Sequence, residues 1–238
     1  IIILFLSFID NYMVALVIRA VDWGNIQRSP TFQGIFNYYF SDYHILQRPV
    51  VFESAGTHVD EIIRNLTPIT KKLDIIKAGI KYDVIRGENK YLGEKFLGKW
   101  LERDDTQIPD KEKLEITRLY SKIKTDVHLH QMHYRNEALL EAGIPEQYLP
   151  GMRVPFRHDE NLKLILPLEE NIVRDVERYY KTIKDKQPVT EIYGNLVEIK
   201  PLKDELDGGF ETARKQVEYF LNTHEHAMEE IIKILSTK

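Results

Sequence analysis

The stretch VDWGNIQRSP, residues 21–30, decides how this chain folds. It follows the apolar run 14–18, which is short and rich in β-branched residues, as is typical of a strand buried on both faces. Gly24 and Asn25 favour a turn there, and Pro30 suits the first turn of a following helix, where its missing N–H needs no partner. A strand, a turn and a helix in this order direct backbone N–H groups toward one point. The stretch therefore indicates an anion-binding loop, in which an arginine can fork two oxygens of a phosphate.

The composition of the chain limits which partners and mechanisms such a loop could have. The chain has 238 residues, 43% of them hydrophobic and 29% charged, which is typical of an ordinary globular protein. The net charge of −4 does not favour binding to nucleic acid or to an anionic membrane. The absence of cysteine excludes disulfides, thiolate metal sites and thiol-based mechanisms. We therefore expect neither a nucleic-acid nor a membrane partner and no cofactor, and we predict a cytoplasmic location.

The first residues are unusually apolar. The run 1–9 is too short to span a bilayer, which needs about twenty apolar residues. It also lacks the positive region and the cleavage site of a signal peptide. Two interpretations stay open with equal weight: residues 1–12 are an extension upstream of a start at Met13, or they form an additional buried strand.

Apolar periodicity predicts an alternation of strands and helices. A strand at 13–21, a helix at 29–43 and a strand at 49–57 form a βαβ unit, whose crossover should be right-handed. Further strands are predicted at 162–166 and 189–193, and further helices at 172–183 and 209–235. Between them, helices are predicted at 68–77 (ending at Gly79), 94–102, 111–124 and 136–142. The predicted fold is one α/β domain over 13–238, with a doubly wound, mostly parallel four-stranded sheet, helices on both faces and a helical insertion near 80–155.

The pattern of residues 22–30 resembles the catalytic loop of the low-molecular-weight protein tyrosine phosphatases, in which a cysteine is followed by five residues, an arginine, a serine or threonine, and a proline. Three further stretches are similar to that family in the same order, namely 54–57, 162–171 and 199–214. In the family, the small residues of the first of these allow its turn to pack beside the phosphate loop. Together the similar stretches cover about two thirds of the chain, whereas the insertion has no counterpart.

The resemblance implies roles for particular residues. It places the phosphate-binding loop at Trp23, Gly24, Asn25, Ile26, Gln27, Arg28 and Ser29, of which Asn25, Arg28 and Ser29 match the residues of the family. Asp22 stands at the position of the nucleophilic cysteine. Lys200 stands where the family has the aspartate that protonates the leaving group.

These two substitutions weaken the case for an active enzyme. A carboxylate is a poorer nucleophile than a thiolate, and a lysine does not replace a carboxylic acid as proton donor. The loss of general acid catalysis alone typically costs about 10²–10⁴-fold in rate. The acid role would pass to Asp204 or Asp207 only if their loop changed its register.

Two functions follow from this resemblance. The first is a pseudophosphatase that binds phosphate, a phosphorylated ligand or a protein partner. The alternative is an active phosphatase in which Asp22 acts as nucleophile or as general base. Under the first interpretation we also expect the Asp22 side chain to fill the loop itself, accepting its N–H groups and pairing with Arg28.

The histidines give a weaker signal. His128, His130 and His133 lie within six residues and would suit a metal if the segment were extended, but no carboxylate completes the set, and a solvated loop is the better interpretation. His224 and His226 are two residues apart on a predicted helix and face different directions. We therefore predict that the chain has no metal site.

Two other regions are candidates for binding. Arg153, Arg157 and His158 form a small basic cluster in the sequence, which lines either an anion site or the surface. The insertion carries apolar residues that either pack internally or serve as a docking surface for a partner or a second subunit.

Overall fold

The computed structural model of this chain describes residues 15–158, 162–182, 191–192 and 209–236. The predictions for residues 1–12, Lys200, Asp204 and Asp207 concern positions outside these ranges.

The sheet confirms the α/β class and shows that its strands are not all parallel. In the described part of the chain five strands lie in the order β2-β3-β1-β4-β5. They are β1 (Leu16–Asp22), β2 (His44–Ile45), β3 (Arg48–Gly56), β4 (Leu162–Pro167) and β5 (Glu191–Ile192). β3, β1, β4 and β5 are parallel neighbours, whereas the short β2 pairs antiparallel with β3. The sheet is therefore mixed, because the chain returns through a tight hairpin at 46–47 that the prediction missed.

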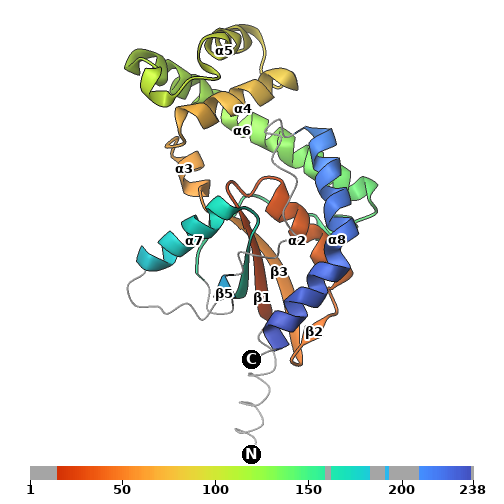
Figure 1. The fold of residues 1–238 in the computed structure, drawn as a ribbon. Helices are drawn as coiled ribbons and strands as arrows, with labels where there is room; N and C mark the ends of the chain where they lie inside the picture. The colour runs from red at the N-terminus through yellow and green to blue at the C-terminus, as the bar shows by residue number, and fades with distance from the viewer. Residues whose placement is uncertain (1–14, 159–161, 183–190, 193–208, 237–238) are drawn as a thin grey trace, which may run out of the picture.

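Helices connect the strands and extend beyond the sheet (Figure 1). They are α2 (Arg28–Tyr39), α3 (Val59–Ile63), α4 (Ile69–Lys81), α5 (Gly87–Trp100), α6 (Asp110–Glu141), α7 (Glu170–Thr182) and α8 (Phe210–Ser236). Short 3-10 turns at Asp105–Gln107 and Glu146–Tyr148 flank α6. α4 and α5 stand beyond the end of the sheet where β1 and β3 finish, and α6 runs from there down to α8 (Figure 1).

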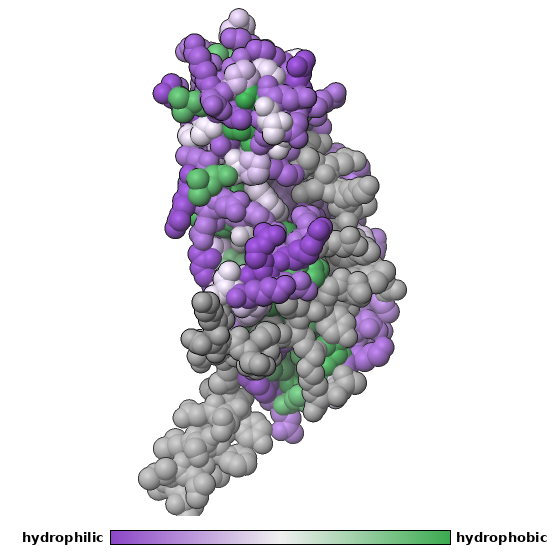
Figure 2. Space-filling model, turned by 60° about the vertical axis from the view of Figure 1, so that its left-hand side comes forward, coloured by the Kyte–Doolittle hydropathy of each residue, from purple (hydrophilic) through white to green (hydrophobic). Residues whose placement is uncertain are grey.

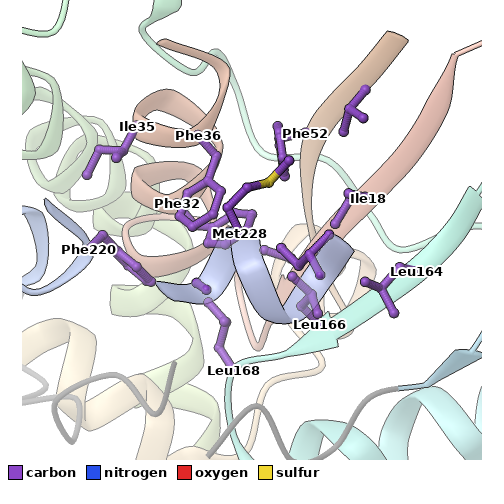
Figure 3. Close-up of a cluster of buried hydrophobic side chains, with 14 of the residues drawn as sticks. Ile18, Phe32, Ile35, Phe36, Phe52, Leu164, Leu166, Leu168, Phe220 and Met228 are labelled. Carbon is purple, nitrogen blue, oxygen red and sulfur yellow. The ribbon is translucent and has the colours of Figure 1, made fainter. Parts of the chain in front are cut away.

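Alternating side chains of the strands belong to two different hydrophobic clusters. The larger contains Ile18, Phe52 and Leu164 of the sheet together with side chains of α2 and α8. Its aromatic centre is visible in Figure 3, where Phe32 contacts Phe36, Phe52 and Phe220. The smaller cluster joins Val17, Val21 and Ile165 to residues of α7. The two alternating sets of strand side chains are thus each covered by helices: α2 and α8 pack on one set, and α7 packs on the other.

A third cluster holds the helices α4, α5 and α6 together and includes Leu73, Phe96, Trp100 and Ile116. α6 corrects the prediction of two helices at 111–124 and 136–142, because it is one continuous helix of 32 residues. The segment between those two ranges carries many polar residues but neither Gly nor Pro, so nothing interrupts the helix. α4 likewise continues through Gly79, where a Cβ would lie 2.8 Å from a methyl carbon of Val127. This glycine allows α4 to pack closely on α6 and does not end the helix.

The described residues on the face shown in Figure 2 are mostly hydrophilic. In the coloured part of Figure 2, hydrophobic residues form small separate patches. None of the described helices combines the length with the apolar character needed to cross a membrane.

Candidate functional site: the loop between β1 and α2

The residues predicted to form the loop lie at the carboxyl end of β1, beside the ends of two parallel neighbours. Asp22 is paired with Gly56 at the end of β3, and Val21 is paired with Pro167 at the end of β4. The chain connects β1 to β3 on one side, whereas β4 lies on the other. Ligands of open α/β sheets bind at such a change of strand order, outside the carboxyl ends of the strands.

The Asp22 carboxylate lies inside the loop. Its Oδ1 accepts the backbone N–H of Asn25 at 2.5 Å, and its Oδ2 accepts that of Ser29 at 3.0 Å. Asp22 is only 3% exposed. Both oxygens of one carboxylate thus receive backbone N–H groups, one from the loop and one from the first turn of α2, whose N–H groups have no partner within the helix.

Arg28 is buried, with 4% of its surface exposed, so it is not a surface charge. Its Nη2 forms an ion pair with Oε1 of Glu169, which follows β4. We expected Arg28 to pair with Asp22, but the carboxylate that the structure places against the guanidinium is that of Glu169. The sequence signal that would have identified Glu169 is its place directly after a strand parallel to β1.

Asn25 gives the loop its sharp bend. Its φ of 50° lies in the left-handed region, which asparagine tolerates better than most residues. It is 1% exposed, and its Nδ2 is buried without a hydrogen-bond partner. Ser29 is fully buried, and its Oγ lies 3.4 Å from the carbonyl oxygen of Ala55 in β3. The loop is therefore closed against the sheet.

The end of β3 supports the loop from below. The backbone N–H groups of Thr57 and His58 donate to the carbonyls of Asp22 and Trp23. A Cβ at Gly56 would lie 2.8 Å from the nitrogen of Asn25, which is closer than real Cβ contacts allow. The expectation that small residues at 54–57 let this turn pack beside the loop agrees with this geometry.

The helical insertion also contacts the loop, which the sequence did not suggest. Arg135 of α6 is fully buried, and its guanidinium donates to the carbonyls of Ile26, at 2.9 Å, and of Pro150, at 2.7 Å. Burial lowers the pKa of Arg135 to about 10, and the charge of Asp22 opposes this shift. Gln27 donates to the carbonyl of Gln131, also in α6, at 3.4 Å. The insertion therefore holds the outer side of the loop.

An aromatic pair lies beside the loop. The ring of Trp23 stacks on that of His58, with centroids 5.2 Å apart. Nδ1 of His58 lies 2.8 Å from Oγ1 of Thr57, and Nε2 lies 3.7 Å from a carboxylate oxygen of Asp175 in α7. Trp23 is half-buried, so it marks the edge of the loop that solvent reaches.

The predicted histidine and arginine clusters separate in space. His128 is buried in α6 and His133 is exposed, so the expectation of a solvated loop at 128–133 is wrong. Arg157 pairs with Asp60 at 2.5 Å, whereas His158 contacts Tyr179 and Tyr180. Among the described residues, no group of three or more side chains is arranged to hold a metal ion.

No protein-family model matches this chain, and no curated protein sequence matches it significantly. The likeness to the phosphatase family therefore rests on residues 22–30 and on the three further similar stretches of sequence. The contacts of residues 22–30 place carboxylates of this chain against the loop: Asp22 faces the amides, and Glu169 faces the guanidinium.

Proposed function

We propose that this chain is a pseudophosphatase: a protein built like a low-molecular-weight tyrosine phosphatase that acts by binding and not by catalysis. The observation that carries the proposal is the pair of hydrogen bonds from Asn25 and Ser29 to the two oxygens of Asp22. A substrate phosphate entering the loop would have to displace this carboxylate. The displaced charge would then repel the phosphate.

The arrangement of the strands supports the proposed kinship. Without β2, the parallel strands lie in the chain order second, first, third, fourth, which is typical of doubly wound sheets. The loop of residues 22–29 and Glu169 lie at the change of strand order, where that architecture binds its ligands. These features favour the doubly wound fold expected from the sequence.

The chemistry of the loop supports a loss of activity. Each Asp22 oxygen accepts one backbone N–H, and a hydrogen bond to a carboxylate oxygen makes it a weaker nucleophile. Lys200 stands at the position where the phosphatase family has the aspartate that protonates the leaving group. Without these two catalytic groups of the family, the thiol and the proton donor, the function that remains is binding, either of an anionic ligand outside the filled loop or of a protein partner.

The test is to restore the missing thiol. p-Nitrophenyl phosphate is a suitable substrate because its leaving group needs little protonation. We expect no turnover by the unmodified chain, with or without magnesium. In Asp22→Cys, the thiolate should attack phosphorus to form a P–S bond, and the P–O bond to nitrophenolate should break. The phosphoryl group would be found by mass spectrometry on Cys at position 22, the one thiol of the variant.

Asp22→Ser is the matched control, because it empties the same space without supplying a good nucleophile. Phosphorylation at position 22 in the cysteine variant, with no phosphorylation at that position in the serine variant, supports the proposed kinship. Turnover by the unmodified chain that Asp22→Asn abolishes would overturn the proposal and establish the alternative, a phosphatase that uses Asp22 itself.

A further inference from the structure

A second group of cationic side chains lies outside the loop, on one face of α6. Nζ of Lys124 lies 5.7 Å from the centre of the Tyr120 ring, and Nζ of Lys72, from α4, lies 6.0 Å from it. Tyr120 is fully buried, so its ring forms a floor beneath the two ammonium groups. Arg153, in the segment after α6, reaches the same face through His128, one of whose ring nitrogens is 2.9 Å from Nη1 of Arg153.

These cations have few counter-charges. In the described residues, none of Lys72, Lys124 and Arg153 forms an ion pair with a carboxylate. The charge of Asp105 acts on Lys72, but the Asp105 oxygens already accept the N–H groups at the start of α4. Lys124 donates to the carbonyls of Ile62 and Ile63 and to Asn65, none of which carries a negative charge. Positive charge at this face is therefore in excess.

Arg153 is held in place with hydrogen-bonding capacity to spare. Burial and the nearby charges of Arg153 and Lys124 lower the pKa of His128 to about 3, so the imidazole is neutral and its Nδ1 accepts from the guanidinium. This is the one hydrogen bond of Arg153 to the described residues, and a guanidinium has five N–H donors. Arg153 is half-buried, so solvent still reaches part of its side chain.

Burial and the charges of Arg153 and Lys72 also lower the pKa of Lys124. An anion bound here would relieve that repulsion. Beside the cations the chain exposes apolar side chains: Ile63 and Leu66 adjoin the groups that Lys124 contacts, and Met152 and Val154 flank Arg153. The site thus offers a fork for an oxyanion and apolar surface next to it.

We propose that Arg153 binds the phosphate group of a small phosphate monoester, that Lys124 contributes its positive charge while its three donors stay on Ile62, Ile63 and Asn65, and that the apolar part of the ligand lies against the exposed side chains beside them. His128 orients Arg153 and does not contact the ligand. The site includes none of residues 22–29, although Ile62 packs against Gly24, and it does not depend on the proposed loss of catalysis. It gives the chain a place to bind phosphate although the loop after β1 is filled.

The test uses phenyl phosphate and inorganic phosphate with the full chain. Calorimetry should show that phenyl phosphate binds, and more tightly than inorganic phosphate. In a ¹⁵N NMR titration, the Nε–H of Arg153 and the amides of Met152 and Val154 should shift, while those of Asn25 and Ser29 should not. Arg153→Gln should weaken binding roughly 10- to 100-fold, since it removes charge-assisted hydrogen bonds. Arg86→Gln removes an exposed arginine elsewhere and should bind like the unmodified chain.

Equal binding by the two variants, or no binding by the unmodified chain, would overturn the proposed site. The NMR titration tests the proposed site without any variant, because it locates the ligand in the native protein. Shifts at Asn25 and Ser29 in the unmodified chain would contradict the filled loop, and shifts confined to them would contradict the Arg153 site as well. Release of phenol would be detected separately and would count against the pseudophosphatase alone.

Discussion

At the scale of single residues, the loop depends on Asp22 because the buried N–H groups of Asn25 and Ser29 need an acceptor. A buried donor that loses its acceptor costs about 1–3 kcal/mol. We therefore expect Asp22→Ala to lower the free energy of unfolding by about 2–4 kcal/mol in chemical denaturation. The exposed Asp42→Ala should be neutral within about 0.5 kcal/mol.

Asp22→Ala also distinguishes two roles for this carboxylate: a structural group that only stabilises the loop, or a group that occupies an anion-binding position. With Asp22 removed, phosphate should raise the melting temperature of the variant, because the freed amides can bind the anion in the native state only. The comparison is made with Arg153→Gln as background, so that the second site does not contribute. A melting temperature of Asp22→Ala that phosphate leaves unchanged would mean that the loop is not an anion cradle.

His128 makes a second residue-scale prediction, on pH dependence. Its pKa is lowered from 6.5 to about 3, so between these values the unfolded chain binds a proton that the folded chain does not. Stability is therefore greatest above pH 6.5 and falls as pH drops toward 3, by about 1.4 kcal/mol per pH unit from this group. His128→Gln keeps an acceptor for Arg153 and should flatten this slope in denaturation curves between pH 6 and 4.5. Identical slopes for the variant and the unmodified chain would refute the assignment.

At the scale of elements, β3 and the loop pack so closely at Gly56 that there is no room for a side chain between them. Because a Cβ at Gly56 would lie 2.8 Å from the backbone of Asn25 and Gly24, Gly56→Ala must move one of the two segments. We expect a loss of about 2–3 kcal/mol in the free energy of unfolding. Gly98, in helix α5, has nothing within 4 Å of its Cβ position, and Gly98→Ala should stabilise by about 0.5–1 kcal/mol. Similar effects at the two glycines would show that the loop is not packed as described.

The elements that the sequence predicted well share a simple local signal. β1, β3 and β4 each contain a short apolar run, and the apolar residues of α2 and α8 recur with helical spacing, so each element was placed within a few residues. The middle of α6 has no such pattern. Its buried residues include two polar side chains, Arg135, which bonds to the loop and to residue 150, and His128, which bonds to Arg153. Gln131 is also buried there and accepts from Gln27 through its backbone carbonyl. Partners distant in sequence decide that segment, and a single sequence does not reveal them.

For the candidate site, too, local signals could be predicted from the sequence and distant contacts could not. The loop itself could be predicted, because a strand, a glycine turn and Arg-Ser-Pro follow one another directly. Glu169 could be placed near the loop, because it follows a strand parallel to β1, but its pairing with Arg28 could not be predicted. Arg135 could not be placed there, since it reaches the loop from a helix more than 100 residues further along the chain. The partner of Arg28 therefore had to be read from the structure.

At the scale of the whole molecule, α6 joins two hydrophobic cores. Ile116, Ile123 and Val127 belong to the helical cluster, whereas Ala138 and Leu139 belong to the core beside the sheet. A continuous helix transmits any disruption of one core to the other. We therefore expect a single thermal transition for the unmodified chain.

Leu129→Pro tests this coupling, because Leu129 is exposed and lies near the middle of α6. A proline there should cost about 3 kcal/mol or more and separate the melting of the two cores into two calorimetric transitions. Leu129→Ala keeps the helix and should retain one transition. Two transitions in the unmodified chain would show that the insertion folds independently of the sheet.

The central claim is that the carboxylate of Asp22 occupies the anion position of the loop. The most direct measurement is the ¹⁵N NMR signal of the Asn25 and Ser29 amides during a titration with tungstate, a phosphate mimic. These signals should stay unchanged in the native chain and shift in Asp22→Ser, where the position is vacated. Shifts of both amides in the native chain, at tungstate concentrations that also shift them in the variant, would show that the loop is open and contradict the claim.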